Sequence, residues 1–240
     1  MKILSIDTSS NICSVSLLEN MDIILEEHIE NEKTHSEKLM PMIKEVLEKA
    51  DITLNQIDLF ACSKGPGSFT GIRIGIASIK ALASFPEKPV IGISSLEGLA
   101  YNIKRDGYIA SILDARNDQV YFGLFERKKE IISPIGAYLA DDIQTCLNTI
   151  TPYIEKEITF VGDGNLLHQK KIEKLFAKAK FASKEENKAS SISIGKAAYI
   201  AFKQGKKETT DTLLPLYLRK SSAERIREER ILKQNGNTNS

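Results

Sequence analysis

The stretch GPGSFTGIRIGIASIKALASF, Gly65 to Phe85, decides how the rest of the chain is interpreted. It follows a short apolar run predicted as a strand, Leu59–Cys62, and opens with glycines that permit turns closed to larger residues. Ser68 and Thr70 are candidates to cap the helix that follows. N–H groups at a helix N-terminus suit a phosphate or carboxylate, but the loop lacks the closing Gly-Lys-Ser/Thr of a Walker A motif. Tight packing at a strand-to-helix turn explains the glycines about as well as phosphate binding does.

The helix predicted after this turn has almost no polar surface. Between Gly71 and Phe85 only Arg73 and Lys80 are charged. Two rows at helical spacing are apolar or small: Ile72, Ile76, Ile79 and Ala83 form one, and Gly71, Gly75, Ser78 and Leu82 form the other. A helix that is apolar over most of its circumference is either buried or kept for a partner, and the residues alone leave both possibilities open.

The chain before this stretch begins with three β-branched runs, KILSIDTSS, ICSVSLLEN and DIILEEHIE, spaced as an antiparallel meander. A capping box at Thr34–Glu37 then predicts a helix to about Ala50. Strands at Leu59–Cys62 and Pro89–Ser94 flank the apolar helix, and Ser95–Asn102 follows as a short helix. The resulting order, β-β-β-α-β-α-β, is typical of the repeat unit in the actin, Hsp70 and sugar-kinase superfamily.

A second, abbreviated and irregular unit is predicted to begin near Gly107, with a hairpin across Asn117–Asp118. Later helices are expected at Leu166–Lys180 and Ser191–Gln204. The fold class is therefore α/β, a two-lobed actin-like fold with duplicated units. The predicted parts are an N-terminal lobe with a dimerisation surface (1–104), a smaller C-terminal lobe (105–212), a segment that packs back on the body (213–223) and a charged, disordered tail (224–240).

Composition indicates a cytoplasmic globular protein. The 240 residues are 42% apolar, and 33 basic against 32 acidic residues give a net charge of +1, so no global field favours nucleic acid or membrane as a direct partner. The cysteines Cys13, Cys62 and Cys146 lie far apart and are expected to be reduced thiols. No signal peptide and no apolar run of membrane-spanning length is evident.

Polar residues at the end of the first predicted strand form the turn Asp7–Ser10. In the actin-like superfamily this hairpin approaches nucleotide phosphates, with its aspartate near a metal. The candidate nucleotide-binding residues are Asp7, Thr8, Ser9, Gly65 and Gly67. A turn-forming cluster that satisfies its own backbone is the alternative, and spacing alone favours it.

The three histidines, His28, His35 and His168, show no metal-ligand spacing. His35 lies in the first turn of a predicted helix, where a local hydrogen bond or a partner contact is expected. The lysine-rich run from Lys170 to Lys184 is interleaved or flanked by acidic residues, which favours a solvated helix face over a nucleic-acid patch.

Four motifs resemble the TsaB (YeaZ) family: THSEKLMPMIKEVLEKA, GPGSFTGIRIGIASIKALA, GISSLEGLAY and LPLYLRK. The resemblance spans the first hundred residues almost continuously, thins, and recurs near Leu214. Members of this family belong to the bacterial machinery that makes the threonylcarbamoyl modification of adenosine 37 in tRNAs reading ANN codons.

The resemblance also points to what is missing. The catalytic paralogue TsaD carries metal-binding histidines in a segment of the form N-H-L-E-G-H, whereas Ser94–Leu99 reads S-S-L-E-G-L. Ser95 and Leu99 stand at the histidine positions, and neither side chain offers a nitrogen donor to a metal. No acidic residue lies between Ala189 and Lys207 to match the paralogue's aspartate ligand. The chain is therefore expected to have no catalytic residues and no metal site of its own.

The resemblance implies a non-catalytic scaffold that activates TsaD for transfer of the threonylcarbamoyl group from threonylcarbamoyl-AMP to tRNA. Expected partners are TsaD, the ATPase TsaE, and a second copy of the chain when TsaD is absent, with tRNA contacted only through the complex. No cofactor is expected to bind tightly, and ATP or ADP is expected near subunit junctions. The implied interface residues are His35, Leu39, Met42, Ile43, Val46, Gly71, Ile72, Arg73, Gly75, Ile76 and Ile79.

Two other functions remain as alternatives. One is a stand-alone ATPase or kinase of the same superfamily, which would use Asp7 and the two glycine turns. The other is a metalloprotease, an old label for this branch of the superfamily that the missing histidine motif disfavours.

Overall fold

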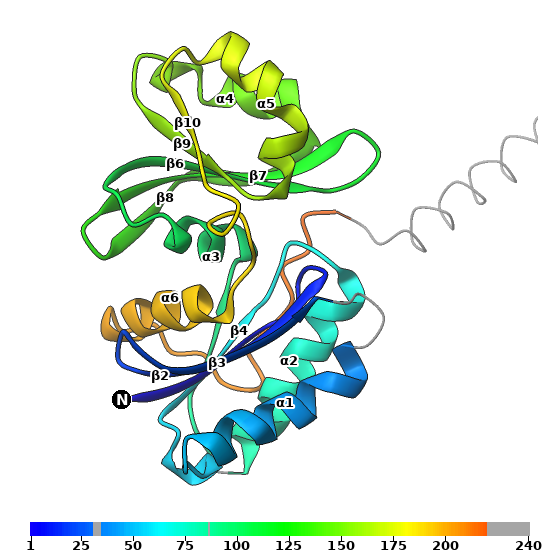
Figure 1. Cartoon of the computed structure of the whole chain (residues 1–240), viewed down its shortest axis with the longest axis vertical. Helices are drawn as coiled ribbons and strands as arrows, with labels where there is room; N and C mark the ends of the chain where they lie inside the picture. Colours follow the sequence, from blue (N-terminus) through cyan, green and yellow to red (C-terminus); the bar gives the residue numbers. More distant parts are fainter. Residues whose placement is uncertain (31–34, 86, 220–240) are drawn as a thin grey trace, which may run out of the picture.

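The computed structural model describes residues 1–30, 35–85 and 87–219, which form two lobes, each built on a five-stranded sheet (Figure 1). The capping residue predicted at Thr34 and the predicted tail from residue 224 lie outside the described residues. Within the described part, no helix has both the length and the apolar character needed to cross a membrane.

The first lobe contains the predicted meander followed by two parallel strands. Its elements are β1 (Lys2–Asp7), β2 (Ile12–Glu19), β3 (Asp22–Glu30), α1 (His35–Lys49), η1 (Leu54–Gln56), β4 (Leu59–Ser63), α2 (Phe69–Ser84), β5 (Val90–Ile93) and α3 (Ser95–Asn102). The strand order is β3-β2-β1-β4-β5, with β1–β3 antiparallel and β4 and β5 parallel to β1. Pro41 lies inside α1, and the helix continues through it.

Helices cover both faces of this sheet, so its central strands are buried on both sides. Leu4 and Ile6 pack with the inner faces of α1 and α2, whereas Ile3 packs in the cluster that contains residues of α3 and α6 (Ser191–Lys203). The alternation follows from the two-residue side-chain period of a strand. The row Ile72, Ile76, Ile79 and Ala83 is thereby buried inside the chain.

The second lobe repeats the plan of the first. Its elements are β6 (Gly107–Asp114), β7 (Gln119–Lys128), β8 (Ile131–Asp142), α4 (Ile143–Thr149), η2 (Thr151–Tyr153), β9 (Ile158–Val161), α5 (Asp163–Leu175) and β10 (Ala179–Phe181). The strand order β10-β9-β6-β7-β8 mirrors that of the first sheet, strand for strand. The expected abbreviation is seen in short counterparts of first-lobe elements, such as the seven-residue α4 and the three-residue β10.

The helix predicted at Leu166–Lys180 differs in the structure, since α5 begins at Asp163 and ends at Leu175. The lysine-rich pattern predicted that the helix continued, but aromatic packing ends it: Phe176 and Phe181 both lie against the ring of Phe160, with centroids 5.8 and 5.9 Å away. A strand, β10, forms where the last turn of helix was expected.

Helices α3 and α6 lie between the two sheets (Figure 1). Helix α6 packs on β1, β2, β4 and α3, so it belongs with the first lobe in space. The predicted C-terminal lobe of residues 105–212 therefore ends earlier than expected, and the chain returns to the first lobe at Ser191. The chain after α6 runs along the first lobe, where Leu213 packs in its core and Leu216 N donates to Lys64 O. Residues 220–223 of the segment predicted from Leu213 lie outside the described residues.

Candidate functional site

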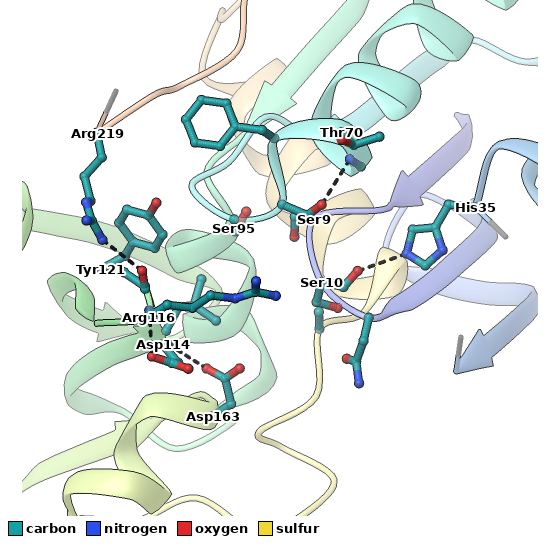
Figure 2. A pocket seen from close by; sticks show the side chains of 18 of the residues that line it. Ser9, Ser10, His35, Thr70, Ser95, Asp114, Arg116, Tyr121, Asp163 and Arg219 are labelled. Carbon is teal, nitrogen blue, oxygen red and sulfur yellow. Dashed lines mark hydrogen bonds between the residues drawn. The ribbon is translucent and has the colours of Figure 1, made fainter. Parts of the chain in front are cut away.

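A cavity of about 860 Å³ lies between the lobes, and segments of both lobes form its wall (Figure 2). The first lobe contributes the β1–β2 hairpin, the start of α2 and part of α3. The second lobe contributes the β6–β7 hairpin and Asp163 at the start of α5, and Arg219 enters from the C-terminal segment. Most of the polar groups in the wall are hydroxyls and guanidinium groups, and its size falls in the range of small-molecule sites.

The β1–β2 hairpin satisfies its own polar groups. Asp7 is 2% exposed, and its Oδ1 accepts hydrogen bonds from Ser9 N at 2.8 Å and from Ser9 Oγ at 2.7 Å. Burial raises the pKa of Asp7, while the two Ser9 bonds and the charge of nearby His35 act in the opposite direction. The structure thus shows the alternative considered for Asp7–Ser10, a turn whose polar groups hydrogen-bond to one another.

His35, the first residue of α1, links this hairpin to the helix by a hydrogen bond. Its Nε2 donates to the carbonyl oxygen of Ser10 at 2.9 Å, which is the local hydrogen bond expected at this position. The ring is 6% exposed, and its Nδ1 is buried without a hydrogen-bond partner. His35 lines the cavity itself, and its bond to Ser10 positions the hairpin beside it.

Replacing Asp7 by asparagine is expected to raise the melting temperature at neutral pH. Because burial raises the pKa of Asp7 above its ordinary value of 3.8, the folded chain holds this proton more tightly than the unfolded chain. Ionisation of Asp7 therefore destabilises the fold as the pH rises above 3.8. The loss is about 1.4 kcal/mol for each pH unit by which the pKa of the folded chain exceeds that of the unfolded chain. An asparagine oxygen still accepts both Ser9 bonds and carries no charge.

Melting curves of the two proteins from about pH 4 to about pH 8 test this, because acidic groups common to both cancel in the difference. The advantage of the variant should grow with pH. Ser9→Ala serves as the matched control, since it removes a hydrogen bond from the same carboxyl and should destabilise instead. A variant at Asp7 that melts lower than the parent across the range would contradict the argument.

The glycine turn serves packing. Gly65 and Gly67 have φ of +102° and +154°, and a Cβ on Gly67 would stand 2.3 Å from the carbonyl oxygen of Ser9. A Cβ on Gly65 would meet the carbonyl oxygen of Leu216 at 2.7 Å. Ser68 caps α2 by accepting from Gly71 N at 3.2 Å, as predicted, while Thr70 lies within the helix. Of the candidate nucleotide residues, Ser9 and Gly67 line the cavity, whereas Asp7, Thr8 and Gly65 lie behind its wall.

The β6–β7 hairpin faces the β1–β2 hairpin, and no site residue was predicted there. Arg116, Asn117 and Asp118 all have positive φ, and Arg116 reaches into the cavity toward Ser9 and Ser10 (Figure 2). Three consecutive non-glycine residues in this region are strained, as is common where a loop serves a site. The hairpin itself was predicted across Asn117–Asp118. Comparing the two repeats would also have marked it as a candidate site loop, since Asp114 ends β6 as Asp7 ends β1.

Asp163 supports this hairpin from the start of α5. Its Oδ1 accepts from Asp114 N at 2.9 Å, and burial raises the pKa of its carboxyl. The side chain of Arg116 is exposed, and the second lobe thus borders the cavity with one basic residue, Arg116, and two acidic ones, Asp114 and Asp163.

The residues implied as a partner interface lie almost entirely inside the chain. Arg73 is exposed, but the other members of the set are buried, and the burial extends to 0% exposure for Val46 and Ile79. The buried members are His35, Leu39, Met42, Ile43, Val46, Gly71, Ile72, Gly75, Ile76 and Ile79. This set was expected to form a surface for a partner, and that expectation is corrected. The small and apolar rows of α2 pack instead on the β1–β2 hairpin and the sheet of the same chain. The outward side of α2 carries Arg73, Ala77, Ala81 and Ser84 instead.

Comparison with known proteins shows the family. A family model described as TsaD, tRNA N6-adenosine threonylcarbamoyltransferase, matches residues 24–226. The tRNA threonylcarbamoyladenosine biosynthesis protein TsaB of Bacillus subtilis is 33% identical over 238 residues, covering 93% of this chain and 96% of that protein. This chain belongs to the TsaB family. The TsaB of Escherichia coli is 37% identical over 131 residues, covering 53% of this chain and 56% of that protein.

Solved structures confirm the actin-like fold expected for a TsaB-family chain. YeaZ from Pseudomonas aeruginosa superposes with a TM-score of 0.76 at 24% identity, covering 90% of this chain and 99% of that one. Component A of the (R)-2-hydroxyglutaryl-CoA dehydratase of Acidaminococcus fermentans reaches a TM-score of 0.50 at 10% identity, covering 86% of this chain and 100% of that one. A TsaB-family protein takes part in making threonylcarbamoyladenosine in tRNA.

The positions that carry histidines in TsaD lie in the cavity wall. Ser95 and Leu99 stand on α3 and line the cavity, and Ser95 Oγ lies 2.7 Å from Ser63 Oγ in a buried hydroxyl pair. Within residues 1–30, 35–85 and 87–219, no three His, Cys, Asp or Glu side chains are grouped so that they could hold a metal ion. The donor set at this place, a hydroxyl and an isobutyl group, does not fit a transition metal.

Proposed function

We propose that the chain is a non-catalytic subunit that activates a TsaD partner for threonylcarbamoyl transfer from threonylcarbamoyl-AMP to adenosine 37 of tRNAs reading ANN codons. The observation that carries this proposal is the cavity wall at α3, where a TsaB-family chain presents Ser95 and Leu99 in place of metal-binding histidines. An enzyme needs positioned reacting groups. Asp7 is the acid that a kinase of this fold would use, but its Oδ1 accepts hydrogen bonds from Ser9 N and Ser9 Oγ. TsaE completes the proposed complex. The chain contacts tRNA only indirectly, through this complex.

The outward side of α2 is the proposed contact with TsaD, and with a second copy of the chain when TsaD is absent. Ala77 and Ala81 are exposed and small, so another helix can approach the α2 backbone closely, while Arg73 supplies a charge at one end. The buried residues of α1 and α2 hold this face rigid by packing against β1, β2 and β4. Their role in the proposed interface is therefore support.

Adenine nucleotide is the proposed ligand of the cavity in the assembled complex, held loosely. Arg116 would face its phosphates, and Ser9 and Thr70 line the same wall with hydroxyl groups. Of the candidate nucleotide residues, Asp7 and Thr8 would shape this wall without reaching the ligand, since both are buried behind it.

Reconstitution tests the proposed function. Cognate TsaD, TsaE, threonylcarbamoyl-AMP and tRNA should give modified adenosine 37 in the presence of the chain and none when it is omitted. ATP turnover by the isolated chain, lost in Asp7→Ala, would instead support the stand-alone ATPase or kinase. Modification that proceeds unchanged without the chain would refute the subunit role.

A further inference from the structure

The C-terminal segment 206–219, here called the strap, is fastened firmly to the first lobe. Glu208 bonds to β5 through its backbone, where Val90 N donates to Glu208 O at 3.2 Å, and through its carboxylate, which accepts from Gly92 N at 2.7 Å. Lys64 Nζ lies 3.5 Å from the same carboxylate. Leu213 is fully buried, and its Cδ1 fills the space that a Cβ on Gly92 would occupy.

The strap is held a second time at the start of α2. The ring of Tyr217 stacks on Phe69 with centroids 4.7 Å apart and planes 11° from parallel. Arg73 Nε donates to Tyr217 Oη at 2.7 Å, and its guanidinium carbon lies 5.6 Å from the ring centroid. Arg73 is exposed on the outward side of α2, so a ligand or partner that binds Arg73 could replace its hydrogen bond to Tyr217.

Beyond Tyr217 the strap crosses to the second lobe. Arg219 Nη1 donates to the carbonyl oxygen of Ala115 at 2.8 Å, in the β6–β7 hairpin (Figure 2). Both Arg219 and Ala115 line the cavity. The lobes are also joined through the apolar cluster around α3 and α6, against which Leu218 of the strap packs. The cavity is thus bounded by a packed core on one side and by this contact on the other.

We propose that the strap acts as a latch. Arg219 holds the β6–β7 hairpin against the first lobe and so sets how far the cavity opens. Because Arg73 holds Tyr217, two residues earlier, the position of Arg219 depends on Arg73. Leu213 and Glu208 keep the strap on the first lobe whether the latch is open or closed. Any group that withdraws Arg73 from Tyr217 frees the end of the strap, so the outward side of α2 and the cavity are coupled. The latch does not rest on the proposed function, because it is a property of the isolated chain.

Distances between the lobes in the isolated chain test the latch. Nitroxide labels are attached to cysteines introduced at Lys44 on α1 and Lys170 on α5, which are both exposed, while the native cysteines are buried. In Arg219→Ala the distance distribution from electron–electron double resonance should broaden and shift relative to the parent. Arg73→Ala should give a shift in the same direction, although Arg73 does not touch the second lobe.

The matched control is Arg105→Ala, whose guanidinium bonds to Thr159 and Glu186 away from the cavity wall. It should leave the distribution unchanged. A distribution in Arg219→Ala that coincides with the parent, with both proteins shown to be folded by their melting curves, would overturn the latch. A shift in Arg219→Ala without one in Arg73→Ala would overturn the coupling to α2.

Discussion

Gly71→Ala is expected to destabilise the fold by about 3 kcal/mol or more. The added Cβ would stand 1.9 Å from the carbonyl oxygen of Thr8, far inside van der Waals contact. Neither side can yield, since Gly71 lies in the first turn of α2 and Thr8 lies in the hairpin where Thr8 Oγ1 donates to Gly71 O at 2.7 Å. Overpacking of this kind costs about 3 kcal/mol or more, a large part of the 5–15 kcal/mol typical of domain stability.

Gly98→Ala is the matched control for this prediction. It also places a methyl group on a buried helical glycine, but the atom it meets at 2.6 Å is Cδ1 of Ile194, the far end of a flexible side chain. Alanine further favours the helix by roughly 0.5–1 kcal/mol over glycine, which offsets part of the cost. Urea unfolding of both variants measures the difference. Similar midpoints for the two would show that the α2–hairpin contact relaxes more easily than its geometry indicates.

The sequence left open whether the tightly packed rows that contain Gly71 and Gly75 face a partner or the chain's own core, and the family resemblance implied a partner. Rows of small and apolar residues show that something packs tightly on α2, and the same rows result whether the neighbour is another chain or a hairpin of the same chain. In the structure a Cβ on Gly75 would meet Thr8 Oγ1 at 2.5 Å, so the neighbour is β1 and its turn. Only the long-range pairing of β1 with β4 brings the two together, and no local pattern records that pairing.

Elements with a clear period were predicted well, and elements fixed by tertiary contacts were not. The meander and α3 lie where they were predicted, because β-branched runs separated by turns are a local signal and α3 begins at Ser95 as expected. The three-residue β10 depends on the Phe160 cluster, and the placement of α6 on the first sheet depends on contacts across the whole chain. The β6–β7 hairpin lies where it was predicted, but its place in the cavity wall was missed, because the positive φ angles of Arg116, Asn117 and Asp118 occur without glycine.

Ala77→Glu is expected to weaken binding to TsaD by at least about a hundredfold while leaving the fold intact. Ala77 is exposed in the isolated chain, so a glutamate there is accommodated by solvent. In the proposed interface the same carboxylate would be buried against a second helix without a partner, which costs several kcal/mol, and each 1.4 kcal/mol is a tenfold change in affinity. Gly75 is unsuitable for this test, because its substitution would disturb the contact with Thr8.

Leu167→Glu, on the exposed surface of α5, introduces the same charge on the other lobe and should leave the affinity for TsaD unchanged. Affinities are measured by calorimetry with cognate TsaD, and the homodimer is followed separately by sedimentation. Because Arg73 lies one turn before Ala77 on the same face, a partner held there also reaches the residue that fastens Tyr217. Equal affinities for Ala77→Glu and the parent would place the TsaD contact away from α2, and the latch would then respond to some other ligand of Arg73.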